Sequence, residues 1–333
     1  EVVYGGRGLV VLDPADGKFF WSFKWAIEGV SPDNVWATGI RVVSATGDET
    51  PDLLVSNSDD QILLIDGADG SVVWQRTVET NLFTTGFALV DADDDSVPDL
   101  FPWYGNTVHS GATGEPLWSA DFPNWVNWAY EAELDGDDRG DLILVAQKAG
   151  MIGTPTGGED EPQLFGIASD GTVLFENLIE GTAWEPAVAQ LDGEGTNEVV
   201  VVTAEGLVLA FDATGTELWR TAYPDGVAEF HRAVAVDLDG DGGDEILAIG
   251  IAWDEERHIV VQLASDGTIE RILRFTSEIR AWALEGDLLI PGGGTDEQSI
   301  AHGFVEAFDR TEGTGSVWRT CRGGGRRKAP ADP

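Results

Sequence analysis

Short apolar segments recur along the whole chain and alternate with polar, glycine-rich segments. The segments 87–90, 142–145 and 199–202 are examples, and they are rich in Val, Leu and Ile. This length and composition are typical of buried β-strands, and no long amphipathic helical pattern interrupts the series. The pattern therefore predicts an all-β chain with many tight turns.

A hairpin with an aromatic residue in a fixed place is the most regular repeat. Each copy reads as a strand, a tight turn rich in Asp and Gly, and a second strand with Trp four residues after the turn glycine. The tryptophans are Trp21, Trp74, Trp118 and Trp219; Phe175 and Arg271 hold the same slot, and a looser copy ends at Trp318. From Trp21 to Arg271, successive slots are 44 to 57 residues apart, a spacing typical of propeller blades.

An acidic loop followed by an apolar strand precedes most of these hairpins. One full repeat is therefore a strand, an acidic loop, a strand, a turn, a strand, an Asp/Gly turn and the Trp strand. Such a unit predicts a β-propeller of four-stranded antiparallel blades, in which closure of the ring protects the sheet edges. A β-solenoid is the tandem alternative, but this repeat is too long and has too many turns for one.

The repeats predict one propeller domain over residues 1–321. We expect seven blades, with eight as the alternative in a longer parent protein. Residues 1–27 would form a partial blade of three strands. Residues 322–333 are basic and rich in Gly and Pro, and we interpret them as a disordered tail or an artificial extension.

Acidic side chains stand at positions 1, 3, 5 and 9 of the acidic loops. Three loops fit the pattern fully: Asp91, Asp93, Asp95 and Asp99; Glu133, Asp135, Asp137 and Asp141; and Asp237, Asp239, Asp241 and Glu245. A fourth loop has the neutral Gln190 at position 1, followed by Asp192, Glu194 and Glu198. The loop with Ser44, Thr46, Asp48 and Asp52 fits poorly, and we interpret it as a solvated turn.

These loops suit a hard cation. Alternate residues of a tight loop converge on one point, and Ca²⁺ takes six to eight oxygen ligands. The carbonyl group at position 7 could add one more, from Val97, Arg139, Thr196 or Gly243. We expect about three to five calcium ions, because carboxylates so close together would otherwise repel one another. A solvated Asp/Gly turn is the alternative for any single loop.

Two family resemblances follow from these residues. The loop from Asp237 to Glu245, with the apolar strand after it, resembles the FG-GAP/VCBS repeats of integrin α-subunit propellers. The hairpins ending at Trp74 and Trp219 resemble the PQQ-like repeats of quinoprotein-type propellers. In such families the tryptophan packs between neighbouring blades, and both resemblances imply the fold more than the function.

The charge of the chain excludes some classes of binding partner. Sixty acidic residues against nineteen basic ones give a net charge of −41. Such a surface repels nucleic acid and anionic membranes, and no apolar run is long enough for a membrane helix. Even five calcium ions would leave most of the charge, so we also expect a halophilic surface that is screened by salt.

The sequence favours a non-catalytic binding or scaffold module, extracellular or at the cell surface. Just before the expected inner strands lie residues that could form a ligand-binding rim: Trp36, Phe83, Trp125, Trp128, Trp184, His231 and Trp282. Aromatic rims suit sugar rings or the apolar side chains of a partner protein. Packing between blades is the alternative role for these residues.

Two enzymatic alternatives remain open. A polysaccharide lyase or glycosidase on a calcium-loaded propeller would need a base near the rim, and Glu229 to Arg232 is the most suggestive segment. A quinoprotein dehydrogenase is less favoured. Those enzymes resemble one another in an adjacent cysteine pair, which the lone Cys321 cannot supply.

Overall fold

The computed structural model describes most of the chain. The described residues are 2–5, 8–12, 18–25, 35–48, 50–79, 86–137, 139–147, 162–193, 195–275, 281–285, 288–294, 302–309 and 317–322. They form strands connected by turns, with one short 3₁₀ helix, η2 (Trp253–Glu255). No helix among these residues has the length and apolar character needed to cross a membrane.

The strands pair in chain order into antiparallel sheets, six of four strands and one of three within the described residues. The three-stranded sheet comprises β1 (Val2–Gly5), β2 (Leu9–Leu12) and β3 (Phe19–Phe23). The next three sheets are β4 (Ala37–Val43), β5 (Asp52–Asn57), β6 (Gln61–Ile65) and β7 (Val72–Thr77); β8 (Phe87–Val90), β9 (Asp99–Pro102), β10 (Thr107–His109) and β11 (Pro116–Ser119); and β12 (Val126–Ala132), β13 (Asp141–Ala146), β14 (Gln163–Ile167) and β15 (Val173–Leu178). The last three are β16 (Ala187–Ala189), β17 (Glu198–Val202), β18 (Leu207–Phe211) and β19 (Glu217–Ala222); β20 (Ala228–Val236), β21 (Glu245–Ala252), β22 (Arg257–Leu263) and β23 (Ile269–Phe275); and β24 (Ala281–Glu285), β25 (Leu288–Gly294), β26 (His302–Asp309) and β27 (Val317–Arg322).

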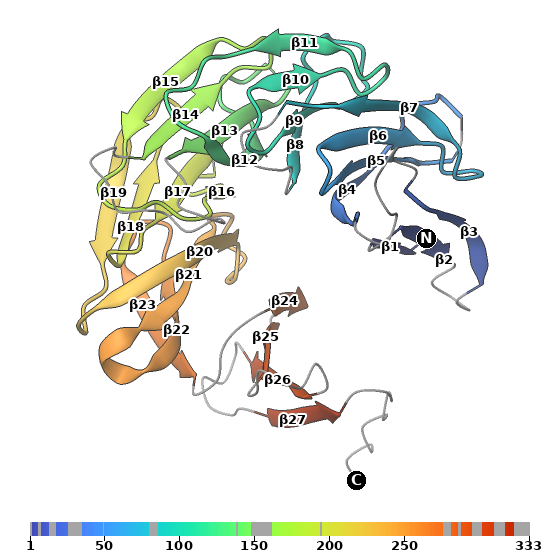
Figure 1. Cartoon of the computed structure of the whole chain (residues 1–333). Helices are drawn as coiled ribbons and strands as arrows, with labels where there is room; N and C mark the ends of the chain where they lie inside the picture. Colours follow the sequence, from blue (N-terminus) through green and yellow to red (C-terminus); the bar gives the residue numbers. More distant parts are fainter. Residues whose placement is uncertain are drawn as a thin grey trace.

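The sheets are arranged around a common centre, as in a β-propeller (Figure 1). The first strand of each four-stranded sheet lies toward the centre and the last strand lies at the rim. Inner strands of successive sheets touch, since β12 contacts both β8 and β16, and β16 contacts β20. The predicted all-β propeller of four-stranded blades is therefore confirmed, while seven as the number of blades stays a prediction.

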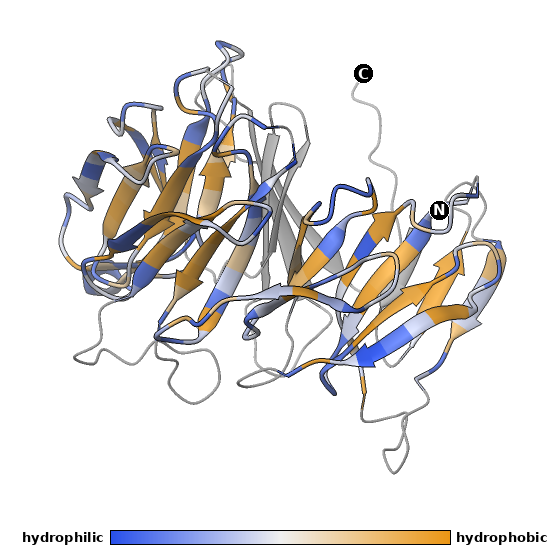
Figure 2. Cartoon of the chain, turned by 90° about the horizontal axis from the view of Figure 1, so that it is seen from above, coloured by the Kyte–Doolittle hydropathy of each residue, from blue (hydrophilic) through white to orange (hydrophobic). Residues whose placement is uncertain are grey.

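The hydrophobic core lies between neighbouring sheets. Middle strands such as β5, β13 and β17 are buried along their whole length, which explains their continuous runs of Val, Leu and Ile. One core cluster joins Leu9 and Trp21 of the first sheet to Leu53 and Ile65 of the next. Figure 2 shows hydrophobic strands with hydrophilic turns at both edges of the sheets.

The tryptophans of the hairpin repeat join one sheet to the next. The ring of Trp74 lies over Gly114 of the following sheet, where a Cβ atom would come within 2.7 Å of the ring. Trp21 lies over Gly70 and Trp219 over Gly267 in the same way. These turn glycines have positive φ angles, so an L-residue there would be strained as well as crowded.

Candidate metal loops and an aromatic face

The acidic loops lie at one edge of the sheets. Each loop joins the first and second strands of a sheet, for example β8 to β9 and β20 to β21. Because the strands are antiparallel, the Asp/Gly hairpin between the third and fourth strands lies at the same edge. The connections between sheets lie at the opposite edge, which we call the connection face.

Three acidic loops bring carboxylates together. The clusters are Asp91, Asp93 and Asp99; Glu133, Asp135 and Asp141; and Asp237, Asp239 and Glu245, each with one oxygen per residue within 4.8 Å of the others. Oxygens on opposite sides of a Ca²⁺ ion at 2.3–2.6 Å are about 5 Å apart, so one ion fits each group. The clusters thus contain positions 1, 3 and 9 of the pattern.

The acid at position 9 also holds the loop in shape. Asp99 is fully buried; its Oδ2 accepts a hydrogen bond from Ala92 N at 2.7 Å and its Oδ1 accepts one from Gly111 N at 2.9 Å. Glu198 and Glu245 accept the equivalent bond from position 2 of their own loops, at 2.6 Å in each. A carboxylate oxygen has two lone pairs, so these bonds leave acceptor capacity for a cation.

The pKa values of the clustered acids report crowding and burial. Burial raises the pKa of Asp99 to about 6, and repulsion from Asp93 adds to the shift. Burial, with repulsion from neighbouring acids, likewise raises the pKa values of Asp141, Glu198 and Glu245. A bound cation would lower all of these values, because it stabilises the charged form of each carboxyl.

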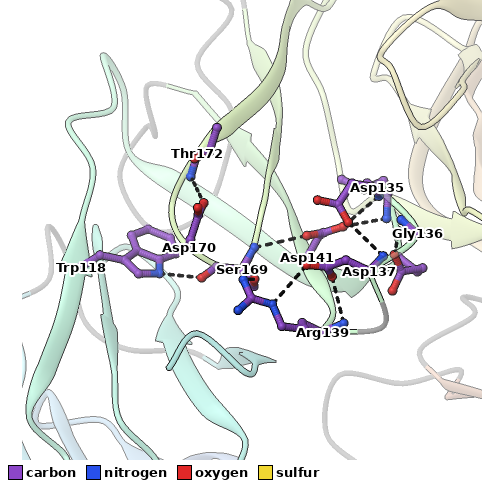
Figure 3. A network of polar contacts seen from close by, with 11 residues as sticks. Trp118, Asp135, Gly136, Asp137, Arg139, Asp141, Ser169, Asp170 and Thr172 are labelled. Carbon is purple, nitrogen blue, oxygen red and sulfur yellow. Dashed lines mark hydrogen bonds and ion pairs between the residues drawn. The ribbon is translucent and has the colours of Figure 1, made fainter. Parts of the chain in front are cut away.

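A continuous chain of hydrogen bonds joins the loop to the tryptophan of the preceding sheet. Figure 3 shows the example at Asp141. The Trp118 Nε1–H donates to the carbonyl oxygen of Ser169 at 2.9 Å, and Ser169 N donates to Asp141 Oδ1 at 3.2 Å. Gly111 makes the same two bonds, to Trp74 and Asp99. The acidic loop and the Trp hairpin therefore form one structural unit that spans two sheets.

The acids at position 5 form hydrogen bonds within their own loops, and positions 5 and 7 stay predicted ligands. Asp95, Asp137 and Asp241 at position 5 are not part of the three clusters, and each accepts a hydrogen bond from the backbone N–H at position 7. Those N–H groups belong to Val97, Arg139 and Gly243. With this geometry the position-5 acids shape the turn.

Arg139 places a cation inside its own loop. Its Nε lies 3.1 Å from Asp137 Oδ2, and its Nη2 donates to Ser169 Oγ at 2.6 Å. Its carbonyl oxygen accepts a hydrogen bond from Asp91 N at 3.3 Å, which joins it to the loop of the preceding sheet. This loop therefore carries a positive charge beside its position-5 acid, outside the cluster of Glu133, Asp135 and Asp141.

Neighbouring loops are tied to one another by reciprocal hydrogen bonds. Asn197 N donates to Glu133 O at 2.6 Å, and Glu133 N donates to Asn197 Oδ1 at 2.7 Å. Asp244 and Gln190 repeat the arrangement, at 2.7 Å and 2.8 Å. The residue at position 8 of one loop thus forms two hydrogen bonds with the residue at position 1 of the loop before it. This contact between loops was not predicted from the sequence. The recurrence of Asn or Asp at position 8 was the available signal.

The two remaining loops are different. In the fourth loop Asp192, Thr196 and Glu198 are described, while Glu194 lies outside the described residues. In the loop from Ser44 to Asp52, Thr46 takes the place of the position-3 acid, and its Oγ1 donates to Asp52 Oδ2 at 3.0 Å. In this loop a hydroxyl group therefore lies beside the position-9 acid and donates a hydrogen bond to it, whereas the clustered loops have a second carboxylate at that place.

Aromatic side chains meet near the inner strands. The rings of Trp128 and Trp184 are 6.2 Å apart, and Trp184 meets His231 edge-to-face at 5.3 Å. We call these three residues the aromatic row. Trp36 is 52% exposed, Trp125 precedes β12 on the connection face, and the side chains of Phe83 and Trp282 lie outside the described residues.

A polar network that the sequence did not indicate also crosses the inner strands. The Tyr130 hydroxyl donates to Glu185, and Glu185 forms an ion pair with Arg232. The ring of Trp103 lies 5.9 Å from that of Tyr130. These residues come from different sheets, so no local sequence pattern could have brought them together.

Comparison with known proteins agrees with this fold. Residues 2–101 match the PQQ_2 family, described as outer membrane protein assembly factor BamB. This match covers less than a third of the chain. No curated protein sequence matches the chain.

Solved structures resemble the chain over most of its length. BamB from Moraxella catarrhalis has a TM-score of 0.55 at 16% identity, with 87% of this chain and 78% of that chain covered. A europium-containing methanol dehydrogenase has a TM-score of 0.62 at 11% identity, covering 96% and 76%. BBS1N, solved in complex with ARL6DN, has a TM-score of 0.53 at 10% identity, covering 96% and 90%. At these identities the likeness shows the β-propeller fold alone.

Proposed function

We propose that this protein is a non-catalytic binding or scaffold module at the cell surface or outside the cell, stabilised by calcium in its acidic loops. The observation that carries the proposal is the convergence of three carboxylates in each of three loops at equivalent places in the repeat. Chance turns in an acidic chain give no reason for the same three positions to converge each time. Calcium would neutralise carboxylates whose pKa values are raised by burial and mutual repulsion.

The partner we propose is a glycan or another protein, bound at the connection face. The aromatic row offers ring faces and edges near the inner strands, which suit sugar rings and apolar side chains. The protein neighbour BBS1N was solved with a bound protein, which is a precedent on a similar fold. The likeness to a methanol dehydrogenase keeps a quinoprotein-type role as the second candidate, although the chain has only one cysteine.

Thermal unfolding with calcium, with EDTA and across a sodium chloride series tests the calcium proposal. A ligand at about 100 times its Kd stabilises the folded state by about 2.7 kcal/mol per site, so loss of three sites should lower the melting midpoint clearly. Metal counting by native mass spectrometry should find at least one ion per clustered loop.

A matched pair of variants makes the test specific. Asp239→Asn changes a clustered acid, and it should remove one ion and part of the EDTA effect. Asp48→Asn changes an acid of the Ser44–Asp52 loop, which belongs to no cluster among the described residues, and it should change neither quantity. A midpoint that ignores EDTA but rises steeply with molar salt would overturn the calcium proposal and favour a halophilic surface.

A further inference from the structure

A pocket of about 280 Å³ opens on the connection face. Its walls are Gly105 and Asn106, in the turn between β9 and β10, and residues Asp121 to Trp125, in the connection between β11 and β12. The acidic loops lie at the opposite edge of these sheets. The pocket is therefore separate from the proposed calcium sites.

The loop that forms the pocket is held in place by its own aromatic residue. The ring of Phe122 meets Phe101 of one sheet edge-to-face at 6.3 Å and Phe165 of the next at 5.3 Å. Beside it, Ala120 N donates to Asn106 O at 2.9 Å and joins the two walls. A wall fixed in this way loses little conformational entropy when a ligand binds.

Two side-chain amides of the lining form hydrogen bonds with neighbouring side chains. Thr107 Oγ1 donates to Asn106 Oδ1 at 3.0 Å, which leaves the Asn106 NH₂ group as a donor. Asn124 Nδ2 donates to Gln163 Oε1 at 3.4 Å, and Gln163 Nε2 is held by Glu176 at 2.7 Å. The Asn124 Oδ1 atom therefore remains as an acceptor.

Asp121 and Trp125 complete the lining. Among the described residues, none forms a hydrogen bond or ion pair with the Asp121 carboxylate, and none accepts from the Trp125 indole N–H. The residues that line the pocket thus carry two acceptors, at Asp121 and Asn124, and two donors, at Asn106 and Trp125. A mixture of this kind suits hydroxyl groups, because each hydroxyl both donates and accepts.

We infer that this pocket binds one pyranose unit of a glycan. At about 280 Å³ the pocket is slightly smaller than most small-molecule sites, which are about 300–1,000 Å³, so it admits a single sugar ring rather than a long chain. A lysine or arginine side chain of a partner protein would need acceptors alone, and the Asn106 and Trp125 donors would face it unfavourably. The inference rests on the proposed role as a binding module, and it does not depend on calcium.

Saturation-transfer NMR on the full chain tests the inference. The probes are methyl α-mannopyranoside, methyl β-galactopyranoside and the methyl β-glycoside of N-acetylglucosamine, with N-acetyl-lysine amide as the cationic comparison. We expect transfer to at least one glycoside, with binding at least tenfold weaker in Asp121→Ala and in Asn124→Ala. Asp59→Ala should leave binding unchanged, because Asp59 lies in the equivalent β5–β6 turn of the preceding sheet and outside the pocket.

The outcomes separate this inference from the calcium proposal. Absence of transfer to all three glycosides overturns it, as does transfer that persists in both pocket variants. Binding of N-acetyl-lysine amide alone, lost in Asp121→Ala, overturns it in favour of a basic protein partner. The EDTA effect on the melting midpoint should be the same in Asp121→Ala and in the unchanged protein, so the calcium proposal stands or fails independently.

Discussion

The indole of Trp74 allows one contact between neighbouring sheets to be tested, through its contribution to the free energy of unfolding. Its side chain is 7% exposed, and its Nε1–H donates to the buried carbonyl oxygen of Gly111 at 2.9 Å. Trp74→Phe keeps an aromatic ring over Gly114 but removes this donor. A buried polar group without a partner costs about 1–3 kcal/mol, so the free energy of unfolding should fall by about this amount.

Urea unfolding followed by circular dichroism measures the effect. The midpoint concentration should fall while the slope of the transition stays the same, because the substitution changes stability and not the surface exposed on unfolding. Trp253→Phe is the matched control. That indole also donates a hydrogen bond, to Glu229 Oε2 at 3.2 Å, but the side chain is 53% exposed, so water can replace the bond.

The natural sequence contains a related exchange. Phe175 holds the tryptophan slot in its own sheet and packs against Gly215, and there Asn177 Nδ2 donates to the Gly215 carbonyl oxygen. This bond goes to the turn glycine itself, and Thr221 makes the equivalent bond to Gly267 beside Trp219, so it does not take the place of the indole donor. Equal shifts for Trp74→Phe and Trp253→Phe would refute the reasoning, because the buried hydrogen bond would then contribute nothing.

Three further predictions concern the loops and the histidines. Asn197→Ala leaves Glu133 N without its partner, so the urea midpoint should fall, with a loss of about 1 kcal/mol in unfolding free energy. Arg139→Gln removes a positive charge beside the acids of its loop, so the calcium affinity of that loop should rise a few-fold in a calorimetric titration. Burial lowers the pKa values of His109 and His231, so the unfolded chain takes up protons first as the pH falls below about 6.5. The two histidines therefore destabilise the fold between about pH 6.5 and 5, while the buried acids with raised pKa values act in the opposite direction. Over this range the melting midpoint of the double His→Gln variant should accordingly fall less, or rise more, than that of the unchanged protein.

The sequence predicted the strands well where burial determines the pattern. The segment 199–202 is β17 without its first residue, and the segment 142–145 is β13 without its first and last residues. Both strands are buried on both faces, so their sequences are uninterrupted apolar runs after one acid. The tryptophan slot was equally clear, because a turn glycine and a bulky ring must recur together in each repeat.

The candidate site was predictable only in part. The clustered acids at positions 1, 3 and 9 belong to one loop each, and spacing alone indicated them. The pair of Glu133 with Asn197 and the network of Tyr130 with Arg232 join residues from different sheets. Those contacts depend on how sheets lie side by side, and no spacing within one repeat encodes that relation.

The acidic loop and the Trp hairpin, which the sequence analysis compared with two different repeat families, are joined by hydrogen bonds in the structure. The position-9 acid belongs to the acidic loop for which we propose calcium, and the tryptophan belongs to the hairpin that we compared with PQQ-like repeats. Ser169 joins them, because its N–H donates to Asp141 and its carbonyl oxygen accepts from Trp118 of the preceding sheet (Figure 3). A change in the charge of Asp141, whether by a cation or by a proton, therefore acts directly on the contact between two sheets. Calcium bound in these loops would stabilise the ring at its joints, and its removal should loosen the packing between sheets before it unfolds any single sheet.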